Sequence, residues 1–259
     1  MPENQEALLP KIGSYNFMAE PFHCDFNDRL FIGHLGNAML NAADFHSNER
    51  GYGMHYLNTI HRTWVLSRLA IEMTETPKAY EEYSIQTWVD AVMRFFTSRN
   101  FAVTSKDSNH VYGYGRSIWA MIDTESRQPV NLFDVRGGII KSYLETEKRN
   151  PIDKLGRVKL NDNSPLVRSI DTFYNDVDLN GHVNSVKYIE HVLDLFDIDY
   201  YRTHALRRFE IAYVAESHAG DRLNFYVEEI SLNEYGIKIT KGTDEETEVV
   251  RSLAEFVEI

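Results

Sequence analysis

The sequence predicts an α+β fold of two similar units, each a curved antiparallel sheet wrapped around one central helix. Three observations predict it. Each half of the chain has one stretch with apolar residues at helical spacing, followed by several runs typical of strands. The two halves also resemble each other at a nearly constant separation. A basic segment interrupted by glycine and proline lies between them and has the character of a connector.

The first half starts with an extended entry and continues with one predicted helix. Its apolar face is formed by five residues at helical spacing: Leu35, Ala38, Met39, Ala42 and Ala43. Strand-like runs follow at residues 64–73, 84–89, 99–104 and 114–122. We expect the sheet built from these runs to cover the apolar face of the helix.

The second half repeats this order. A helix over about residues 184–196 is predicted by four apolar residues at spacings of three and four: Val186, Ile189, Leu193 and Phe196. Strand-like runs follow at residues 209–214, 223–227, 237–239 and 249–257. Residue types that favour tight turns separate them at residues 220–221 and 233–236.

The resemblance between the halves indicates one structural unit used twice. Residues 33–35 and 181–183 share Gly-His followed by an aliphatic residue at an offset of 148, and residues 71–89 resemble residues 211–227 at an offset near 140. Two such units can join their sheets edge to edge, which removes one exposed edge from each. The predicted architecture is therefore a double hot-dog, with one helix lying in the curve of each sheet.

The boundary between the units is indicated by a change in charge. Residues 136–159 carry seven basic and three acidic side chains, a net charge of +4 in a chain whose net charge is −12. We predict an amino-terminal hot-dog domain over residues 1–140, a basic connector over residues 141–165 and a carboxyl-terminal hot-dog domain over residues 166–259.

Composition excludes several classes of protein. The chain has 259 residues, 43% of them apolar, and no apolar run long enough for membrane insertion. The strong negative charge disfavours nucleic acid as a partner. Cys24 is the only cysteine, so no disulfide framework can form within the chain, and the amino end shows no signal-peptide pattern. A cytoplasmic location is expected. Neither a metal-ligand pattern nor a phosphate-binding glycine loop is present, so no metal or other cofactor is expected.

The densest group of polar side chains lies at residues 174–184. Asp178, Asn180 and His182 are spaced by two, and an extended segment would point them to one side. Gly181 lets the backbone bend, and the start of the next helix suits an oxyanion. The alternative is that these residues only form turns and cap a helix.

A comparison of the two copies favours the functional interpretation. At the offset of 148, the first copy has Leu30 and Ile32 where the second has Asp178 and Asn180. Polar groups needed only for the shared fold should occur in both copies. We therefore expect a site in the second half and an apolar lining from the first.

Residues 178–189 resemble the signature of the plant and bacterial acyl-acyl-carrier-protein (acyl-ACP) thioesterases. Residues 64–73, 87–89 and 116–123 resemble blocks from the amino-terminal half of that family. The resemblance implies two tandem hot-dog domains and hydrolysis of the thioester of fatty acyl-ACP in fatty acid biosynthesis. It also implies four catalytic residues: Asp178, Asn180, His182 and Glu216. Many plant members have cysteine where this chain has Ser217, so a thiol mechanism is untenable here.

The resemblance also suggests what each catalytic residue does. His182 and Glu216 would orient and deprotonate water, and Asn180 would position the water or the carbonyl. The backbone N–H groups near residues 181–184 would receive the oxyanion. Asp178 would either orient His182 or attack the carbonyl directly.

The acyl chain and the carrier protein need further surfaces. The resemblance places the acyl tunnel largely in the amino-terminal half, with five candidate lining residues: Leu30, Ile32, Met39, Trp64 and Met73. Acyl carrier protein is acidic, so docking on this acidic chain needs a local positive patch. We expect that patch to include Lys148, Arg149, Arg207 and Arg208.

Three other activities remain open from the sequence. An acyl-CoA thioesterase could use the same residues. A catalytically silent acyl-binding module could share the fold, because fold does not fix function. A hot-dog dehydratase would release water from a 3-hydroxyacyl thioester. The chain could act as a monomer or as a homodimer.

Overall fold

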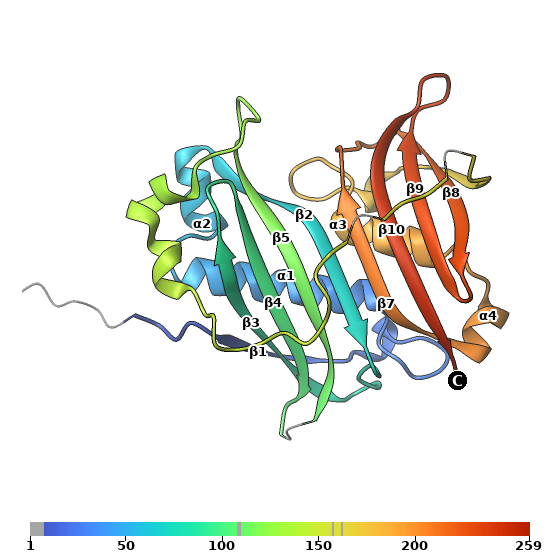
Figure 1. The fold of residues 1–259 in the computed structure, drawn as a ribbon, viewed down its shortest axis with the longest axis horizontal. Coiled ribbons are helices and arrows are strands. Elements are labelled where there is room, and N and C mark those ends of the chain that lie inside the picture. Colours follow the sequence, from blue (N-terminus) through green and yellow to red (C-terminus); the bar gives the residue numbers. More distant parts are fainter. Residues whose placement is uncertain (1–7, 108–109, 157, 162) are drawn as a thin grey trace, which may run out of the picture.

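Ten strands form one antiparallel sheet in a computed structural model that describes residues 8–107, 110–156, 158–161 and 163–259. The strand order is β1-β3-β4-β5-β2-β7-β10-β9-β8-β6. The strands of the first half thus fill one side of the sheet and those of the second half the other (Figure 1). The predicted α+β class, with a curved sheet and a central helix in each half, is confirmed.

The first half contains the predicted helix and all four predicted strand runs, each slightly longer than expected. Its elements are β1 (Gly13–Met18), η1 (Pro21–His23), α1 (Ile32–Glu49), α2 (Met54–Leu57), η2 (Asn58–Ile60), β2 (Arg62–Met73), β3 (Glu82–Val92), β4 (Phe96–Ser105), β5 (Val111–Asp123) and η3 (Leu132–Tyr143). The apolar face of α1 is buried, as its spacing predicts.

The second half follows the same plan. Its elements are β6 (Leu166–Asp171), η4 (Tyr174–Asp176), α3 (Ser185–Leu193), α4 (Ile198–Thr203), β7 (His204–Tyr213), β8 (Arg222–Ser231), β9 (Glu234–Lys241) and β10 (Thr247–Glu258). Helix α3 ends three residues before the predicted end at residue 196. The side chain of Asp197 instead accepts a hydrogen bond from the N–H of Tyr200 and starts α4. Phe196 packs on Phe256, with ring centroids 4.7 Å apart.

The two halves meet where β2 pairs with β7. Residues 68–72 of β2 lie opposite residues 208–212 of β7, with Leu69 facing Ile211 and Ile71 facing Phe209. Each of these strands would otherwise be an exposed edge, so the pairing satisfies the backbone groups of both. The sheet is therefore continuous across the junction.

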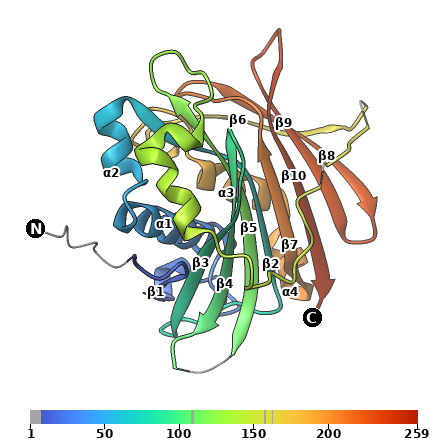
Figure 2. The ribbon, with the colours of Figure 1, turned by 60° about the vertical axis from the view of Figure 1, so that its left-hand side comes forward.

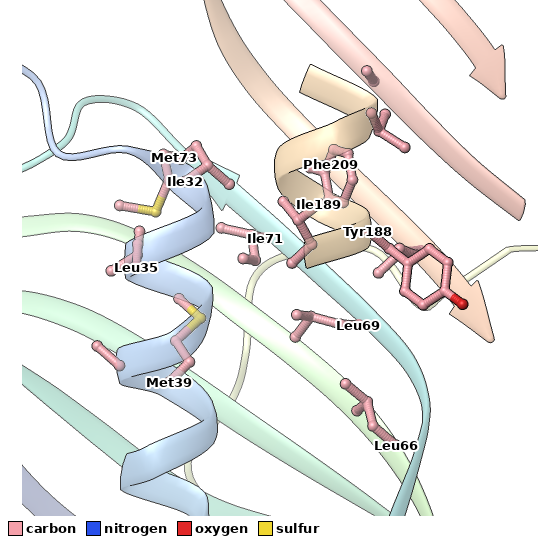
Figure 3. Close-up of a cluster of buried hydrophobic side chains, with 14 of the residues drawn as sticks. Ile32, Leu35, Met39, Leu66, Leu69, Ile71, Met73, Tyr188, Ile189 and Phe209 are labelled. Atoms are coloured by element: carbon pink, nitrogen blue, oxygen red, sulfur yellow. The ribbon is translucent and has the colours of Figure 1, made fainter. Parts of the chain in front are cut away.

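Helices α1 and α3 lie against the same face of the curved sheet (Figure 2). They approach closely because glycines of α1 face α3: a Cβ on Gly36 would lie 3.3 Å from Cδ1 of Ile189. One apolar core spans both halves, and Figure 3 shows Leu35 of α1, Ile71 of β2 and Phe209 of β7 within it. None of the described helices combines the length and the apolar character needed to cross a lipid bilayer.

The predicted connector crosses the face of the sheet opposite the helices (Figure 1). Asn150 donates from Nδ2 to the carbonyl of Gly115 on β5, at 2.7 Å. Further along, the carbonyl of Gly156 accepts from Arg68 on β2, at 3.2 Å. Both of these contacts are with the first half, and the carbonyl of Val158 accepts from Nη1 of Arg251 on β10, at 3.3 Å, so the connector is held against both halves. Helix η3 ends at Tyr143, just beyond the predicted boundary at residue 140.

Candidate active site

Asp178, Asn180 and His182 lie on a tight loop between η4 and α3. The N–H of Asp178 donates to the carbonyl of His182 at 2.9 Å, and Oδ1 of Asp178 accepts from the N–H of Asn180 at 2.8 Å. Gly181 has a φ of +80°, a value that glycine adopts without steric cost. The segment thus reverses direction. Our expectation of an extended segment was wrong, because the Asp178 carboxylate folds the backbone into a turn.

The loop brings His182 to Glu216. Nε2 of His182 lies 3.4 Å from Oε2 of Glu216, which follows β7. The N–H of Val183 donates to the carbonyl of Ser217 at 2.8 Å and so fixes the loop beside this segment. An imidazole and a carboxylate this close can contact the same water molecule and take up its proton, as general base catalysis requires.

Ser217 is too deeply buried to act as a nucleophile. Only 1% of its surface is exposed. Tyr188 of α3 is buried as well, and burial raises the pKa of its phenol to about 12. Neither hydroxyl is therefore suited to attack a substrate, and the reactive groups are those of the loop and Glu216.

Arg127 is part of the site and was missed in the sequence. It lies in the turn after β5, and its Nη2 pairs with Oε1 of Glu216. That turn is built by Asp123, whose Oδ1 accepts from the N–H of Ser126 at 2.8 Å; hydrogen bonds from Ser126 hold the pKa of Asp123 below its usual value. Arg127 therefore reaches across from the first half and fixes one oxygen of Glu216 while His182 contacts the other.

A cavity of about 300 Å³ opens beside the loop. Asp178 and Asn180 line one side of it. The other side comes from the first half, and its apolar lining includes Leu40 and Ala43 of α1, Trp64 and Leu66 of β2, Trp119 of β5 and Ile140 of η3. The loop of the second half therefore faces a wall supplied by the first, which is apolar at these positions and polar at Asn37, Asn41, Asp44, Ser47, Thr97 and Arg99. Such a cavity suits an acyl chain.

The five predicted lining residues do not lie together. Trp64 lines the cavity beside Asp178. Leu30, Ile32 and Met73 instead line a second, larger cavity of about 460 Å³. Met39 is fully buried and lines neither of these two cavities. Its place in the predicted lining is wrong, because its side chain fills the core against Gly115.

The four predicted docking residues also separate. Arg208 is only 8% exposed and forms ion pairs with Glu72 and Glu210, so it was wrong to place it on an accessible surface. Lys148 lies over the ring of Trp88, at 4.7 Å, and burial lowers the pKa of its ammonium. Arg149 and Arg207 are exposed, and Arg207 lines the larger cavity.

The alignment of the two copies at an offset of 148 was wrong. The loop that corresponds to residues 178–184 in the structure is residues 25–31, at an offset of 153, because the two loops form the same hydrogen bonds. The N–H of Asp25 donates to the carbonyl of Arg29, as that of Asp178 does to His182, and Oδ1 of Asp25 accepts from Asn27. The first copy therefore has both the aspartate and the asparagine. What it lacks is the histidine.

Comparisons with protein families match both halves of the chain. The model of the acyl-ACP thioesterase N-terminal domain matches residues 14–138, and that of the acyl-ACP thioesterase C-terminal domain matches residues 161–254. The chain is 49% identical to an acyl-ACP thioesterase of known structure from Bacteroides thetaiotaomicron VPI-5482. That match covers 95% of this chain and 98% of the other, with a TM-score of 0.87.

More distant relatives share the fold. A 12:0-ACP thioesterase from Umbellularia californica has a TM-score of 0.83 at 20% identity, over 98% of this chain and 100% of that one. Oleoyl-acyl carrier protein thioesterase 2 of Arabidopsis thaliana is 24% identical over 89% of this chain and 66% of its own length. A palmitoyl-acyl carrier protein thioesterase from Gossypium hirsutum is 24% identical over 59% of this chain. That match spans only 38% of the cotton protein.

Proposed function

Because the chain belongs to the acyl-ACP thioesterase family, we propose that it hydrolyses fatty acyl-ACP to a free fatty acid and holo-ACP. The observation that carries this proposal is the contact between His182 and Glu216 beside a cavity with an apolar wall. His182 and Glu216 do not line the cavity themselves, but His182 belongs to the loop whose Asp178 and Asn180 do. In this proposal a thioester carbonyl at the mouth of the cavity meets a water molecule held by the pair.

The reaction needs one proton transfer to the protein and one back. The water oxygen bonds to the thioester carbonyl carbon as its proton passes to the His182–Glu216 pair. The carbonyl oxygen becomes an oxyanion, which backbone N–H groups of the loop stabilise. When the oxyanion collapses, the carbon–sulfur bond breaks and the leaving thiolate takes the proton.

Asp178 acts in this proposal by orienting the loop rather than by attacking the substrate. Its Oδ1 accepts from the N–H of Asn180 at 2.8 Å and faces the N–H of His182 at 3.4 Å. Through Oδ1 the carboxylate thus holds the turn that carries His182, which supports an orienting role. Asn180, which also lines the cavity, would position the water or the carbonyl.

The acyl chain would lie against the first half. Each buried methylene contributes about 0.8 kcal/mol, so affinity rises only about fourfold per carbon. Sharp selection of chain length therefore needs a closed end. Arg99 is a candidate for that end, because it lines the cavity, is only 4% exposed and donates to Oγ1 of Thr87 at 3.2 Å.

Docking of the acidic carrier protein would use the exposed Arg149 on the connector. The division of the chain into an acyl-binding domain (residues 1–140), a connector (141–165) and a catalytic domain (166–259) belongs to the same proposal. A cytoplasmic location, which the single cysteine favours, completes it.

The test compares two substrates with the same dodecanoyl chain, one on acyl carrier protein and one on CoA. We expect release of free dodecanoate from both, with the larger kcat/KM for the carrier-linked substrate. A larger value for CoA would assign the chain as an acyl-CoA thioesterase. No release from either substrate would favour a silent acyl-binding module, and loss of water from a 3-hydroxyacyl thioester would identify a dehydratase.

A further inference from the structure

The loop at residues 25–31 lines a cavity of its own. This cavity holds about 460 Å³, within the range of roughly 300–1,000 Å³ typical of ligand sites. Its walls are the start of α1, the carboxyl-terminal part of α3 and residues 205–207 of β7. Both halves thus contribute to it, as they do to the cavity beside Asp178. Here the first half supplies the loop and the second half supplies the facing wall, which is the reverse of the arrangement beside Asp178.

The two cavities are built from corresponding positions. Asp25 and Phe31 line the larger one where Asp178 and Asn184 line the other. The strand residues correspond as well. Leu206 of β7 lines the larger cavity and Leu66 of β2 the smaller, and each directly precedes a break in the strand register. The larger cavity is therefore the pseudo-symmetric counterpart of the candidate active site.

The larger cavity lacks a counterpart of the His182–Glu216 pair, although His34 and Glu75 also line it. Arg29 stands at the position of His182, and its Nε pairs with Oδ2 of Asp25 at 3.1 Å. Thr76 stands at the position of Glu216, because the N–H of Leu30 donates to the carbonyl of Pro77 as that of Val183 does to Ser217. An arginine already paired with the loop aspartate cannot act as a base. A ligand held here would not be hydrolysed.

The lining suits a long apolar chain. Its apolar side chains come from both halves and include Leu30, Ile32, Met73, Leu193, Leu206 and Val257. Four carboxylates also line the cavity, those of Asp25, Glu75, Glu190 and Asp194. Three of them have a basic partner, because Asp25 pairs with Arg29, Glu75 with His110 and Glu190 with Lys187. The interior thus offers mainly hydrophobic contact.

An anionic head group would find two partners at the rim. The side chain of Asn184 caps α3 by accepting from Val186, but Phe31, its counterpart on α1, provides no side-chain cap. Gly33, the counterpart of Val186, lines the cavity. The positive end of an 18-residue helix therefore faces the cavity without a capping side chain. Arg207 lines the same cavity, exposed and without an ion partner among the residues described.

We propose that this larger cavity is a second, non-hydrolytic site that binds a fatty carboxylate, with the chain between α3 and β7 and the head group near Arg207 and the first turn of α1. The site is independent of the catalytic assignment, because none of its residues belongs to the His182–Glu216 pair.

The test is equilibrium dialysis of radiolabelled dodecanoate against the full chain and four variants. Leu206→Trp fills the larger cavity, and Leu66→Trp fills the smaller one at the corresponding position. Arg207→Glu reverses the charge at the rim, and Arg94→Glu reverses an exposed charge that lines neither cavity. We expect Leu206→Trp to remove one bound dodecanoate that Leu66→Trp retains. We expect Arg207→Glu to raise the Kd of that dodecanoate about tenfold, with Arg94→Glu within about twofold of the unchanged chain.

Three outcomes would overturn the proposal. Bound dodecanoate could be lost only in Leu66→Trp. That result would show binding in the smaller cavity alone, which contradicts the second site but is compatible with the proposed hydrolysis. Arg207→Glu could bind dodecanoate as tightly as Arg94→Glu. The larger cavity could also bind 1-dodecanol as tightly as dodecanoate, which would exclude recognition of a carboxylate. Thermal unfolding of each variant shows whether it folds, and if Leu206→Trp does not, the Arg207→Glu comparison decides.

Discussion

Nε2 of His182 lies 3.4 Å from Oε2 of Glu216, and the two residues belong to different elements of the second half. His182 comes from the loop before α3, and Glu216 from the segment after β7. Backbone hydrogen bonds hold these two segments together, since Val183 donates to Ser217 at 2.8 Å. The separation of the two side chains is therefore fixed by the fold.

Removing either member of this pair should abolish most hydrolysis. We expect His182→Ala and Glu216→Gln each to lower kcat by on the order of 10²- to 10⁴-fold, because general acid–base catalysis contributes that much. Both side chains are partly exposed, so the melting temperature should change little. The measurement is release of free thiol from acyl-ACP. Turnover equal to that of the unchanged protein in either variant would remove that residue from the mechanism.

Arg127 should act as a positioning residue through Glu216. We expect Arg127→Ala to lower kcat about tenfold with little change in KM, because the loss of a charged hydrogen bond leaves one carboxylate oxygen unsupported. Arg127→Lys should restore part of the rate. Arg222 provides a matched control, since it is as exposed as Arg127 and pairs with Asp171 rather than with Glu216. An equal loss of kcat in Arg222→Ala would show that the effect is not specific to the site.

The sequence predicted helices α1 and α3, and strands β2 to β5 and β7 to β10, because their apolar spacing is local. It could not predict Arg127, because its contact with Glu216 joins residues 89 positions apart and no local pattern marks such a pair. The early end of α3 has a similar cause. Asp197 caps a new helix, which outweighs the continuing apolar spacing up to Phe196.

The correspondence of the two halves was misjudged for a different reason. Gly33-His34 and Gly181-His182 are identical in sequence, but the glycine and histidine of the first copy lie inside α1, past the loop. The correct partners share backbone hydrogen bonds and backbone conformation rather than residue types. Asp28 and Gly181, for example, both have positive φ. Identity of two residues was therefore weaker evidence than backbone conformation, which the sequence does not display.

The wall of the smaller cavity should control which chain lengths are hydrolysed. Trp64→Ala should shift the preference toward longer acyl chains, each extra methylene gaining about fourfold in kcat/KM. Met39→Ala tests the contrast, because Met39 is buried but lines neither cavity. It should lower the free energy of unfolding by about 2–5 kcal/mol without changing the profile. The check is a series of acyl-ACP substrates. A shifted profile in Met39→Ala would place that residue in the tunnel after all.

Docking of the carrier protein should depend on the charge of Arg149. We expect Arg149→Glu to raise the KM for acyl-ACP by up to about fivefold relative to the KM for the same acyl-CoA, since one exposed charge contributes about 0.2–1 kcal/mol. The effect should shrink at high salt. Lys106→Glu is the control, because Lys106 pairs with Glu82 at the far end of β4. A ratio of KM values unchanged at low salt would exclude the connector as the docking surface.

The junction of the two halves should depend on Arg208. This arginine of β7 pairs with Glu72 of β2 and, at 2.6 Å, with Glu210, and it is only 8% exposed. Arg208→Ala would leave two poorly solvated carboxylates without a cation and should lower the free energy of unfolding by about 3–5 kcal/mol. Arg208→Lys should recover only part of the lost free energy of unfolding, because a single ammonium group lacks the forked guanidinium that reaches both carboxylates.

Urea unfolding measures this loss, with Arg222→Ala as the control for an exposed ion pair, where about 0–1 kcal/mol is expected. The number of transitions in the urea unfolding curve adds a second readout. If the halves separate when Arg208 is removed, unfolding should split into two transitions, since β2 and β7 would no longer be held as one sheet. A stability equal to that of Arg222→Ala, with one transition, would mean that the strand pairing alone holds the halves together.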